Sequence, residues 1–453
     1  MDSIALFSDY VTRTNYSDLP SKAVEITKKF IIDTIGVGIA GLTAPGCLEA
    51  FEVVKHWSGR PEATVLMRNL KCPALWAGFV NSIAMHALDF DDTLDESAHH
   101  ANVSTLPAAL AMAEARGKVT GKELICALAL GQDVSCRLAL SLKRPLAWTR
   151  AATCGYFGAT AAVGKILGLD SEKMRNAFGI AYSQTAGNVQ GLADGALSKR
   201  MQPAFAVKSA ILSACLAERG ITGASNVLEG DFGFFKLYEG NEYDKNVLLK
   251  DLGEDFTGSR LSLKPYPCCR MAHSAIDLAL KLREEHDIKL NTVQGITVIC
   301  SRMVYNMVGK PFEIRNNPQT DAQFSIPYTV ITALLNGDVF LGDFEEDNIR
   351  NQRIIDLTKL VEVIPDNKIE AKDMMECTLE IRTREGQVFR SRTSAAKGNP
   401  LNPMSMDECM EKFRKCLAYG PIPISDDKIA GILNMLERFE DIEDISHFTA
   451  LLS

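Results

Sequence analysis

Apolar residues recur at helical spacing through most of the first 260 residues, and few runs alternate with the period of a strand. The helices predicted from this spacing cover residues 20–40, 72–88, 105–116, 121–142, 151–167, 171–185 and 203–219. Gly41 ends the first of these helices, and the small residues of 151–164 would let two helices approach closely. The pattern therefore predicts an all-α domain in this part of the chain.

The pattern changes after Gly253. Strands are predicted at residues 295–300, 360–365, 377–383 and 387–393, the last two joined by a hairpin at Glu385–Gly386. Helices are predicted at 272–285, 321–336 and 343–352. These elements indicate a smaller α+β domain at about 262–400, whereas 405–419 and 425–438 return to helical spacing and are expected to pack on the first domain. The predicted fold class is mainly α.

The amino-acid composition is that of an ordinary globular protein. The chain has 453 residues, of which 46% are hydrophobic and 23% charged, as in ordinary globular proteins. Its net charge of −8 argues against broad binding of nucleic acid or of an anionic membrane. We expect no signal peptide and no membrane span, and we expect the 12 cysteines to be reduced thiols of a cytoplasmic protein.

Ionisable residues gather in one stretch, 81–114, between two apolar helices. The group consists of Asp89, Asp91, Asp92, Asp95, Glu96, His99 and His100. Thr105 is expected to cap the second helix, and Pro107 suits its first turn. Such groups at the mouth of a rigid scaffold can have shifted pKa values and do acid–base chemistry, although a solvated turn would show the same residues.

One competing motif falls inside this stretch. Residues 91–95 match DDxxD, the pattern that binds magnesium diphosphate in all-α prenyl-transferring and terpene-forming enzymes. Those enzymes need a second metal motif and an aromatic pocket, whereas this sequence has no second motif and only 7% aromatic residues. The cysteines and histidines also lack zinc spacing. We therefore expect no metal and no cofactor.

Cationic residues lie on loops shaped by glycine and proline. Lys199 and Arg200 follow a glycine-rich loop and come just before a predicted helix, where free N–H groups and cations together favour an anion. Lys264 precedes two prolines, and Arg270 and His273 follow shortly after. A cation of this kind is more commonly a solvated side chain, and the position on such loops is the reason to expect a functional role here. Tyr328, after a proline, could be a phenolic acid, but the sequence favours a core aromatic.

The order and spacing of these segments resemble the MmgE/PrpD family, which includes 2-methylcitrate dehydratase, cis-aconitate decarboxylase and iminodisuccinate epimerase. The similar segments are HALDFDDT (86–93), CGYFGATAAVGKILGLD (154–170), the Lys199–Arg200 pair with ACLAERGITG (214–223), LEGDFGF (228–234), KPYPCCRMAH (264–273), DAQFSIPY (321–328) and KGNPLNP (397–403). The resemblance implies a helical domain from both chain ends (1–261 and 404–453), a smaller α+β lid domain (262–403) and a homodimer. It also implies cofactor-independent chemistry on small polycarboxylates.

The resemblance also implies which residues form the site. Carried over position by position, it marks as catalytic Asp89, Thr93, Lys199, Lys264 and Tyr328. A family histidine after the DDT turn falls on His99 or His100, depending on the direction of counting. Many members have further histidines where this chain has Thr149 and Gln202. We place these two residues with the expected substrate-binding set, which also contains Arg200, Arg270 and His273.

The expected reaction removes a proton α to a carboxylate. An imidazole held by Asp89 would transfer the proton, and the cations would stabilise charge on the carboxylate oxygens. Loss of hydroxide would make the enzyme a hydro-lyase of the 2-methylcitrate dehydratase kind, which we place first. Return of the proton would make it an epimerase, and loss of carbon dioxide a decarboxylase. A non-catalytic binding protein is the remaining alternative.

Overall fold

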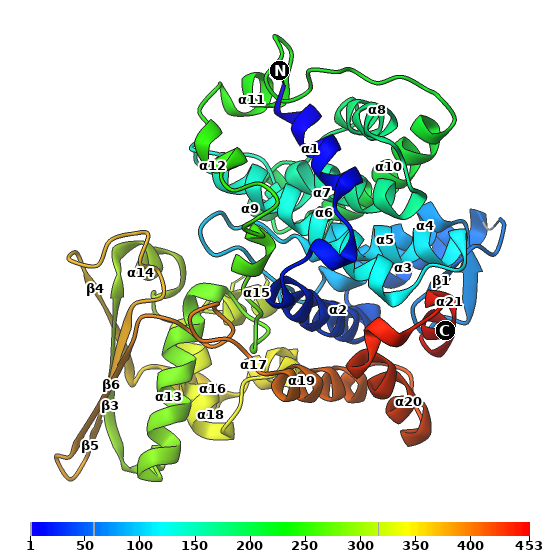
Figure 1. Cartoon of the computed structure of the whole chain (residues 1–453). Coiled ribbons are helices and arrows are strands. Elements are labelled where there is room, and N and C mark those ends of the chain that lie inside the picture. The colour runs from blue at the N-terminus through cyan, green and yellow to red at the C-terminus, as the bar shows by residue number, and fades with distance from the viewer. Residues whose placement is uncertain (1, 58, 316) are drawn as a thin grey trace. The chain divides into compact units, whose positions relative to one another are not determined.

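The computed structural model describes residues 2–57, 59–315 and 317–453 and is mainly α, as predicted (Figure 1). The chain forms two compact units. The helical unit ends at Ser262 and resumes over Ser405–Ser453, and the α+β unit is Leu263–Met404. These limits lie one residue from the predicted ones.

The helical unit contains all the helices expected in it. Its elements from the first part of the chain are α1 (Ser3–Arg13), α2 (Ser21–Ala40), α3 (Cys47–Trp57), β1 (Ala63–Val65), β2 (Leu70–Cys72), α4 (Ala74–Met85), α5 (Asn102–Arg116), α6 (Gly121–Ser141), α7 (Arg150–Leu167), α8 (Ser171–Tyr182), α9 (Gln190–Ala193), α10 (Ser198–Glu218), α11 (Phe234–Glu239) and α12 (Lys245–Leu249). Helices α5, α6, α7 and α10 pack against one another in the core. The prediction of close approach is confirmed, because a Cβ atom at Gly131 of α6 would lie 2.6 Å from the carbonyl oxygen of Gly158 in α7.

Several elements of this unit were not predicted. The antiparallel pair β1 and β2 makes the prediction of an all-α domain wrong in this detail. A strand of three residues is too short for its alternation to be recognised in a sequence. Helices α1 and α3 were also missed.

Helix α6 is long and apolar enough to span a membrane, and so is the bent pair formed by α2 and α3. The sequence prediction expected no such segment. In the window that passes this test, 94% of the residues of α6 are buried inside the unit. Asp133 and Arg137 in the middle of this helix are fully buried and form an ion pair at 2.8 Å. These features are typical of a core helix.

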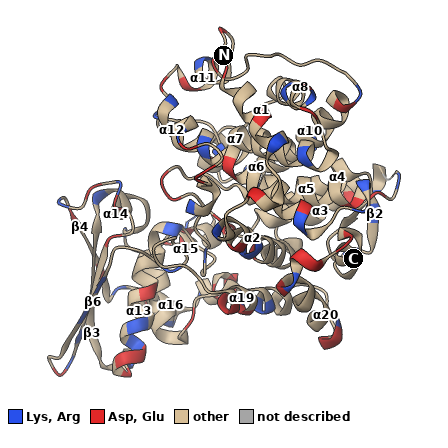
Figure 2. Ribbon diagram, in the orientation of Figure 1, with Lys and Arg blue, Asp and Glu red and all other residues tan. Residues whose placement is uncertain are grey.

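The last part of the chain returns to the helical unit with α19 (Met406–Tyr419), α20 (Asp426–Glu437) and α21 (Ile445–Leu451). Helix α19 packs along α2. The contact is close, since a Cβ atom at Gly36 would lie 2.9 Å from the Phe413 ring. Figure 2 shows that α19 carries many charged residues, whereas α7 carries few.

The α+β unit is built on a four-stranded sheet with the order β4-β3-β5-β6. Its strands are β3 (Val293–Ser301), β4 (Val361–Asp366), β5 (Cys377–Thr383) and β6 (Val388–Thr393). Strand β4 runs parallel to β3, and the other pairs are antiparallel. The predicted hairpin joins β5 to β6, with Gly386 at φ +85° in its turn. All four predicted strands are therefore present.

The helices of this unit are α13 (His273–His286), α14 (Arg302–Val308), α15 (Pro318–Gln323), α16 (Ile326–Asn336), α17 (Glu346–Ile349) and α18 (Gln352–Thr358). Helices α13 and α16 pack on each other and contribute to the core over the sheet. Two predicted helices are each divided. Residues 321–336 divide into α15 and α16 because Ser325 caps a new helix at the Tyr328 N–H, and 343–352 gives only the short α17 before α18 begins.

All twelve cysteines lie among the described residues and are free thiols. Only Cys215 is partly exposed. Burial raises the pKa of Cys47 and Cys72 to about 11, so these thiols are protonated and unreactive at neutral pH.

The helical unit exposes a chain of aromatic rings. Trp57 lies 4.8 Å from Trp76, which lies 6.0 Å from Phe79, which lies 5.5 Å from Phe205, measured between ring centroids. Trp57 is 54% exposed and Phe205 is 42% exposed. Large apolar side chains exposed side by side are typical of a surface that another protein covers.

We predict that this surface forms the homodimer expected from the sequence. Light scattering should give twice the mass of one chain, and Phe205→Glu should shift the population to monomer because it puts a charge in an apolar contact. Val388→Glu, on an exposed position of the α+β unit, is the control and should remain dimeric. A monomeric wild type would contradict the prediction.

Candidate functional site

The site turn, residues 86–93, joins the end of α4 to the loop before α5. Helix α5 begins at Asn102, three residues earlier than predicted. Its first N–H groups are held by Asp92, whose carboxylate accepts from the backbone nitrogens of Ala101 at 3.0 Å and Asn102 at 3.2 Å. The prediction that Thr105 caps this helix is wrong, since its hydroxyl lies inside the helix and donates to the carbonyl oxygen of Ala101 at 2.8 Å. Pro107 likewise lies inside the helix.

Two imidazoles share one carboxylate in this turn. The Asp91 Oδ2 atom lies 2.9 Å from Nδ1 of His86 and 2.8 Å from Nδ1 of His100. Nδ1 of His100 also lies 2.7 Å from the carbonyl oxygen of Asp92. A carboxylate and a carbonyl only accept, so both Nδ1 atoms carry the proton. In the neutral form of either ring the lone pair is then on Nε2, where it can act as a base.

The two adjacent aspartates titrate in opposite directions. Burial by itself would raise the pKa of Asp91, but its interactions with His86 and His100 outweigh burial and hold that pKa well below the usual range. Burial raises the pKa of Asp92 to about 7, and the neighbouring Asp91 charge adds to the increase. Asp91 is therefore the ionised acceptor of this cluster.

The histidines also differ from one another. Burial, followed by the charge of Lys199, lowers the pKa of His86 to about 4. His99 is fully buried, and burial lowers its pKa to about 3, so it is neutral. The His100 side chain is 18% exposed and bonded to Asp91. Of the two predicted candidates, only His100 combines an orienting carboxylate with access to solvent.

The expected partner of the imidazole was Asp89, whose catalytic role stays a prediction. Asp89 has a left-handed backbone, with φ +54°, and it is Asp91 that holds His100. His86 was missed altogether, because it stands at the end of the apolar helix predicted at 72–88. Its signal was the spacing of five residues to Asp91, which a helix end followed by a turn can bring into contact.

The predicted cations of α10 face different neighbours. Lys199, in the first turn of α10, is near enough to His86 to lower its pKa. Arg200 instead donates to the carbonyl oxygen of Pro45 at 2.7 Å, at the start of α3. The structure therefore brings Lys199, and not Arg200, to the imidazole cluster.

Thr149 and Gln202 both contact Asn188. The Gln202 amide accepts from the backbone nitrogen of Asn188 at 2.8 Å and donates to its carbonyl oxygen at 2.9 Å. The Thr149 hydroxyl donates to the same carbonyl oxygen at 2.8 Å. These two side chains thus hold the backbone of Asn188 in place, in the segment that leads to Lys199. Their predicted role in binding substrate stays a prediction.

The carboxylates of the DDxxD match turn to three different partners. Asp91 contacts the imidazoles, Asp92 caps α5, and Asp95 accepts from the Ser262 hydroxyl at 2.8 Å. Thr93 exchanges two backbone hydrogen bonds with Ser262, at 2.9 and 2.7 Å. This arrangement does not support a shared magnesium site.

One group of described residues has the donor types of a metal site. The ligand atoms of His86, Asp91 and His100 lie within 4.8 Å of one another, and this donor set suits Zn²⁺ or another divalent transition ion. The same atoms are already joined by hydrogen bonds of 2.8 and 2.9 Å. The contacts thus fit a hydrogen-bonded cluster, and metal independence stays a prediction.

The remaining candidates belong to the α+β unit and are mostly buried in it. Arg270 donates to Nδ1 of His273 at 3.1 Å and to the carbonyl oxygen of Lys397 at 2.8 Å. Lys264 is 2% exposed. The fully buried Tyr328 packs beside Phe312 and donates its hydroxyl to the carbonyl oxygen of Asp343 at 2.5 Å. Tyr328 is thus the core aromatic favoured by the sequence, and its expected catalytic role gains no support from this position.

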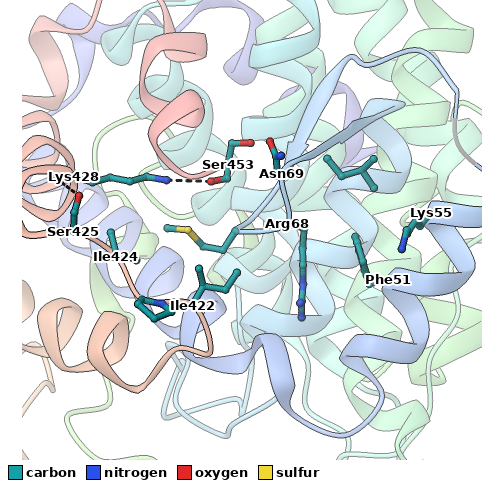
Figure 3. Close-up of a pocket in the computed structure, with 12 residues that line it drawn as sticks. Phe51, Lys55, Arg68, Asn69, Ile422, Ile424, Ser425, Lys428 and Ser453 are labelled. Carbon is teal, nitrogen blue, oxygen red and sulfur yellow. Dashed lines mark hydrogen bonds between the residues drawn. The ribbon is translucent and has the colours of Figure 1, made fainter.

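A pocket of about 790 Å³ lies elsewhere in the helical unit (Figure 3). Phe51, Arg68, Ile422 and Lys428 are among the residues that line it, and no predicted site residue is among them. Arg68 donates to the carbonyl oxygen of Leu42 at 2.8 Å, and Lys428 donates to the Ser453 oxygen at 3.1 Å. The pocket therefore lacks the acid–base groups found around Asp91.

Comparison with known proteins shows which family the chain belongs to. The chain is 27% identical to the human protein named cis-aconitate decarboxylase, over 96% of this chain and 91% of that protein. It is 25% identical to the mouse protein of that name, over 98% and 92%, and 22% identical to the 2-methylcitrate dehydratase of Cupriavidus necator, over 90% and 88%. The MmgE/PrpD N-terminal domain matches residues 5–246, and the MmgE/PrpD C-terminal domain matches 266–434. The chain belongs to the MmgE/PrpD family.

Proposed function

We propose that this protein is a cofactor-independent lyase that transfers a proton at the carbon next to a carboxylate of a small tricarboxylate. The observation that carries the proposal is the position of His100. Its Nδ1 proton is held by the ionised Asp91, its ring is partly exposed, and its Nε2 lone pair is available as a base. The names of the relatives support a tricarboxylate as the substrate.

The reaction needs a base and a cation of the protein that both contact the same bound substrate. His100 Nε2 takes the proton, and the electron pair of the broken C–H bond moves toward the neighbouring carboxylate. The ammonium group of Lys199 stabilises the charge that grows on the carboxylate oxygens. The carboxylate of Asp91 stabilises the imidazolium that forms, since an ionised partner favours the charged ring. The proton on His100 can then return to the product or to the leaving group.

Dehydration was placed first from the sequence. In that reaction the electron pair forms a carbon–carbon double bond, hydroxide leaves, and a proton converts it to water. Decarboxylation is the second candidate, and it is favoured by the higher identity of the human decarboxylase, 27% against 22% for the dehydratase. In that reaction a carbon–carboxylate bond breaks, carbon dioxide leaves, and the electron pair left on carbon takes a proton from the imidazolium form of His100, which then regains a proton from solvent. His100 is thus the base in the dehydration and the acid in the decarboxylation.

A binding protein without catalysis is the contrasting hypothesis. Its support was the absence of histidine at Thr149 and Gln202, and both residues have a structural contact with Asn188 instead. The cluster of His86, Asp91 and His100 supports catalysis, because ionisable groups with strongly shifted pKa values, here His86 and Asp91, tend to gather at functional sites.

We predict that the protein exchanges a substrate proton with solvent after dialysis against a chelator. Citrate, 2-methylcitrate, cis-aconitate and iminodisuccinate would be incubated with it in heavy water and followed by NMR. Deuterium should enter at a carbon next to a carboxylate, and water or carbon dioxide loss then identifies the reaction. Loss of exchange that added Mg²⁺ or Zn²⁺ restores would contradict metal independence. Absence of exchange with every compound, with or without metal, would favour the binding protein.

We predict that His100→Ala lowers turnover by about 10² to 10⁴-fold with little change in KM, because it removes the base and not a binding contact. His99→Ala should retain turnover but unfold at a lower temperature, since it leaves a cavity at a fully buried position. His56→Ala, on α3, is the control for loss of an imidazole. Loss of turnover in His99→Ala alone would mean that the base has been assigned to the wrong histidine.

We predict that Lys199→Ala raises KM and lowers kcat together, because the ammonium group attracts the carboxylate more strongly as its charge grows. A charge-assisted contact contributes about 1.5–3 kcal/mol, which corresponds to a loss of about 10- to 150-fold in kcat/KM. Arg200→Ala is the matched control on the next residue and should change kcat/KM much less, because Arg200 is bonded to Pro45. If Lys199→Ala abolishes turnover and leaves KM unchanged, Lys199 is the base.

A further inference from the structure

A buried lysine from the last part of the chain contacts the site turn. Lys412, on α19, is 5% exposed, and its Nζ atom lies 2.6 Å from Oδ1 of Asp33 on α2. The same Nζ donates to the carbonyl oxygen of Phe90 at 3.0 Å and lies 3.6 Å from the centre of the Phe90 ring. One ammonium group thus joins two helices to the residue between Asp89 and Asp91.

From these contacts we infer that Lys412 and Asp33 are positioning residues for the reaction, acting through the Phe90 backbone on the direction of the Asp91 carboxylate. The inference rests on the proposed function. Asp91 must point to the two imidazoles while Asp92 points to the start of α5. Fixing the carbonyl oxygen and the ring of Phe90 fixes the peptide that leads into Asp91.

Energetics favour this role over simple stabilisation. A buried ion pair loses the hydration of both charges, and replacement by apolar residues of similar volume is often neutral or stabilising. Here the ammonium group contacts the carboxylate of Asp33 as well as the carbonyl oxygen and the ring face of Phe90. Such a point charge with three partners specifies one arrangement of the turn.

The test uses the double variant Asp33→Asn with Lys412→Met, which removes both charges and keeps the side-chain volumes similar. We expect the variant to fold with a melting temperature close to that of the wild type. Proton exchange should fall by about 10- to 100-fold in kcat, with KM nearly unchanged, because the base and its carboxylate are misplaced by a fraction of an ångström or more. The matched control is Lys29→Met, which removes a buried lysine of α2 that pairs with Glu25 at 2.7 Å. The control should keep the wild-type kcat.

A readout without substrate separates this inference from the proposed function. The Nδ1 protons that His86 and His100 share with Asp91 should give downfield proton NMR signals in the wild type. These signals should shift or disappear in the double variant and remain in Lys29→Met. If the wild type shows no exchange, the proposed function fails, and the signals still decide whether Lys412 positions Asp91.

A folded double variant with unchanged signals and unchanged kcat would overturn the inference. If the double variant does not fold, Lys412→Arg takes its place. This variant keeps the charge near Asp33, but a planar guanidinium group cannot occupy the same three contacts as an ammonium group. It should shift the downfield signals and lower kcat about tenfold or more. Unchanged signals and kcat in Lys412→Arg would equally overturn the inference.

Discussion

The candidate site depends on one buried carboxylate that stays ionised. Asp91 is fully buried, a position that ordinarily protonates a carboxyl group, yet two imidazole N–H groups bond to the same oxygen. Those bonds decide the tautomer of both rings and leave both Nε2 atoms as acceptors. If the carboxylate were replaced or turned away, the Nδ1 proton of His86 would lose this acceptor, and that of His100 would keep only the carbonyl oxygen of Asp92.

Two adjacent aspartates of this turn therefore have different tasks. Asp91 faces the imidazoles, and Asp92 caps α5 with its carboxylate at the backbone N–H groups of Ala101 and Asn102. Asp91 lies in a bend and Asp92 follows it, and the side chains of these two adjacent aspartates reach different partners. Phe90 lies fully buried just before them and supplies the surface through which Lys412 contacts the turn.

The loop before α10 is arranged on a similar principle. The side chains of Thr149 and Gln202 satisfy the backbone of Asn188, which a loop residue would otherwise leave to water. The loop then enters the first turn of α10, where Lys199 influences His86. Positions that carry histidine in many family members thus have a structural task in this chain.

The sequence by itself determined the mainly α fold, the helices of the core and the four strands of the α+β unit, because apolar periodicity over many residues is a strong signal. It also located the ionisable turn and identified the family through its motifs. It could not determine the start of α5, because the capping carboxylate of Asp92 comes from ten residues before Asn102. Nor could it select Asp91 over Asp89, recognise His86, or separate the buried His99 from the partly exposed His100. Those distinctions depend on side-chain direction and burial, which arise only when α2, α4, α5 and α19 pack around the turn.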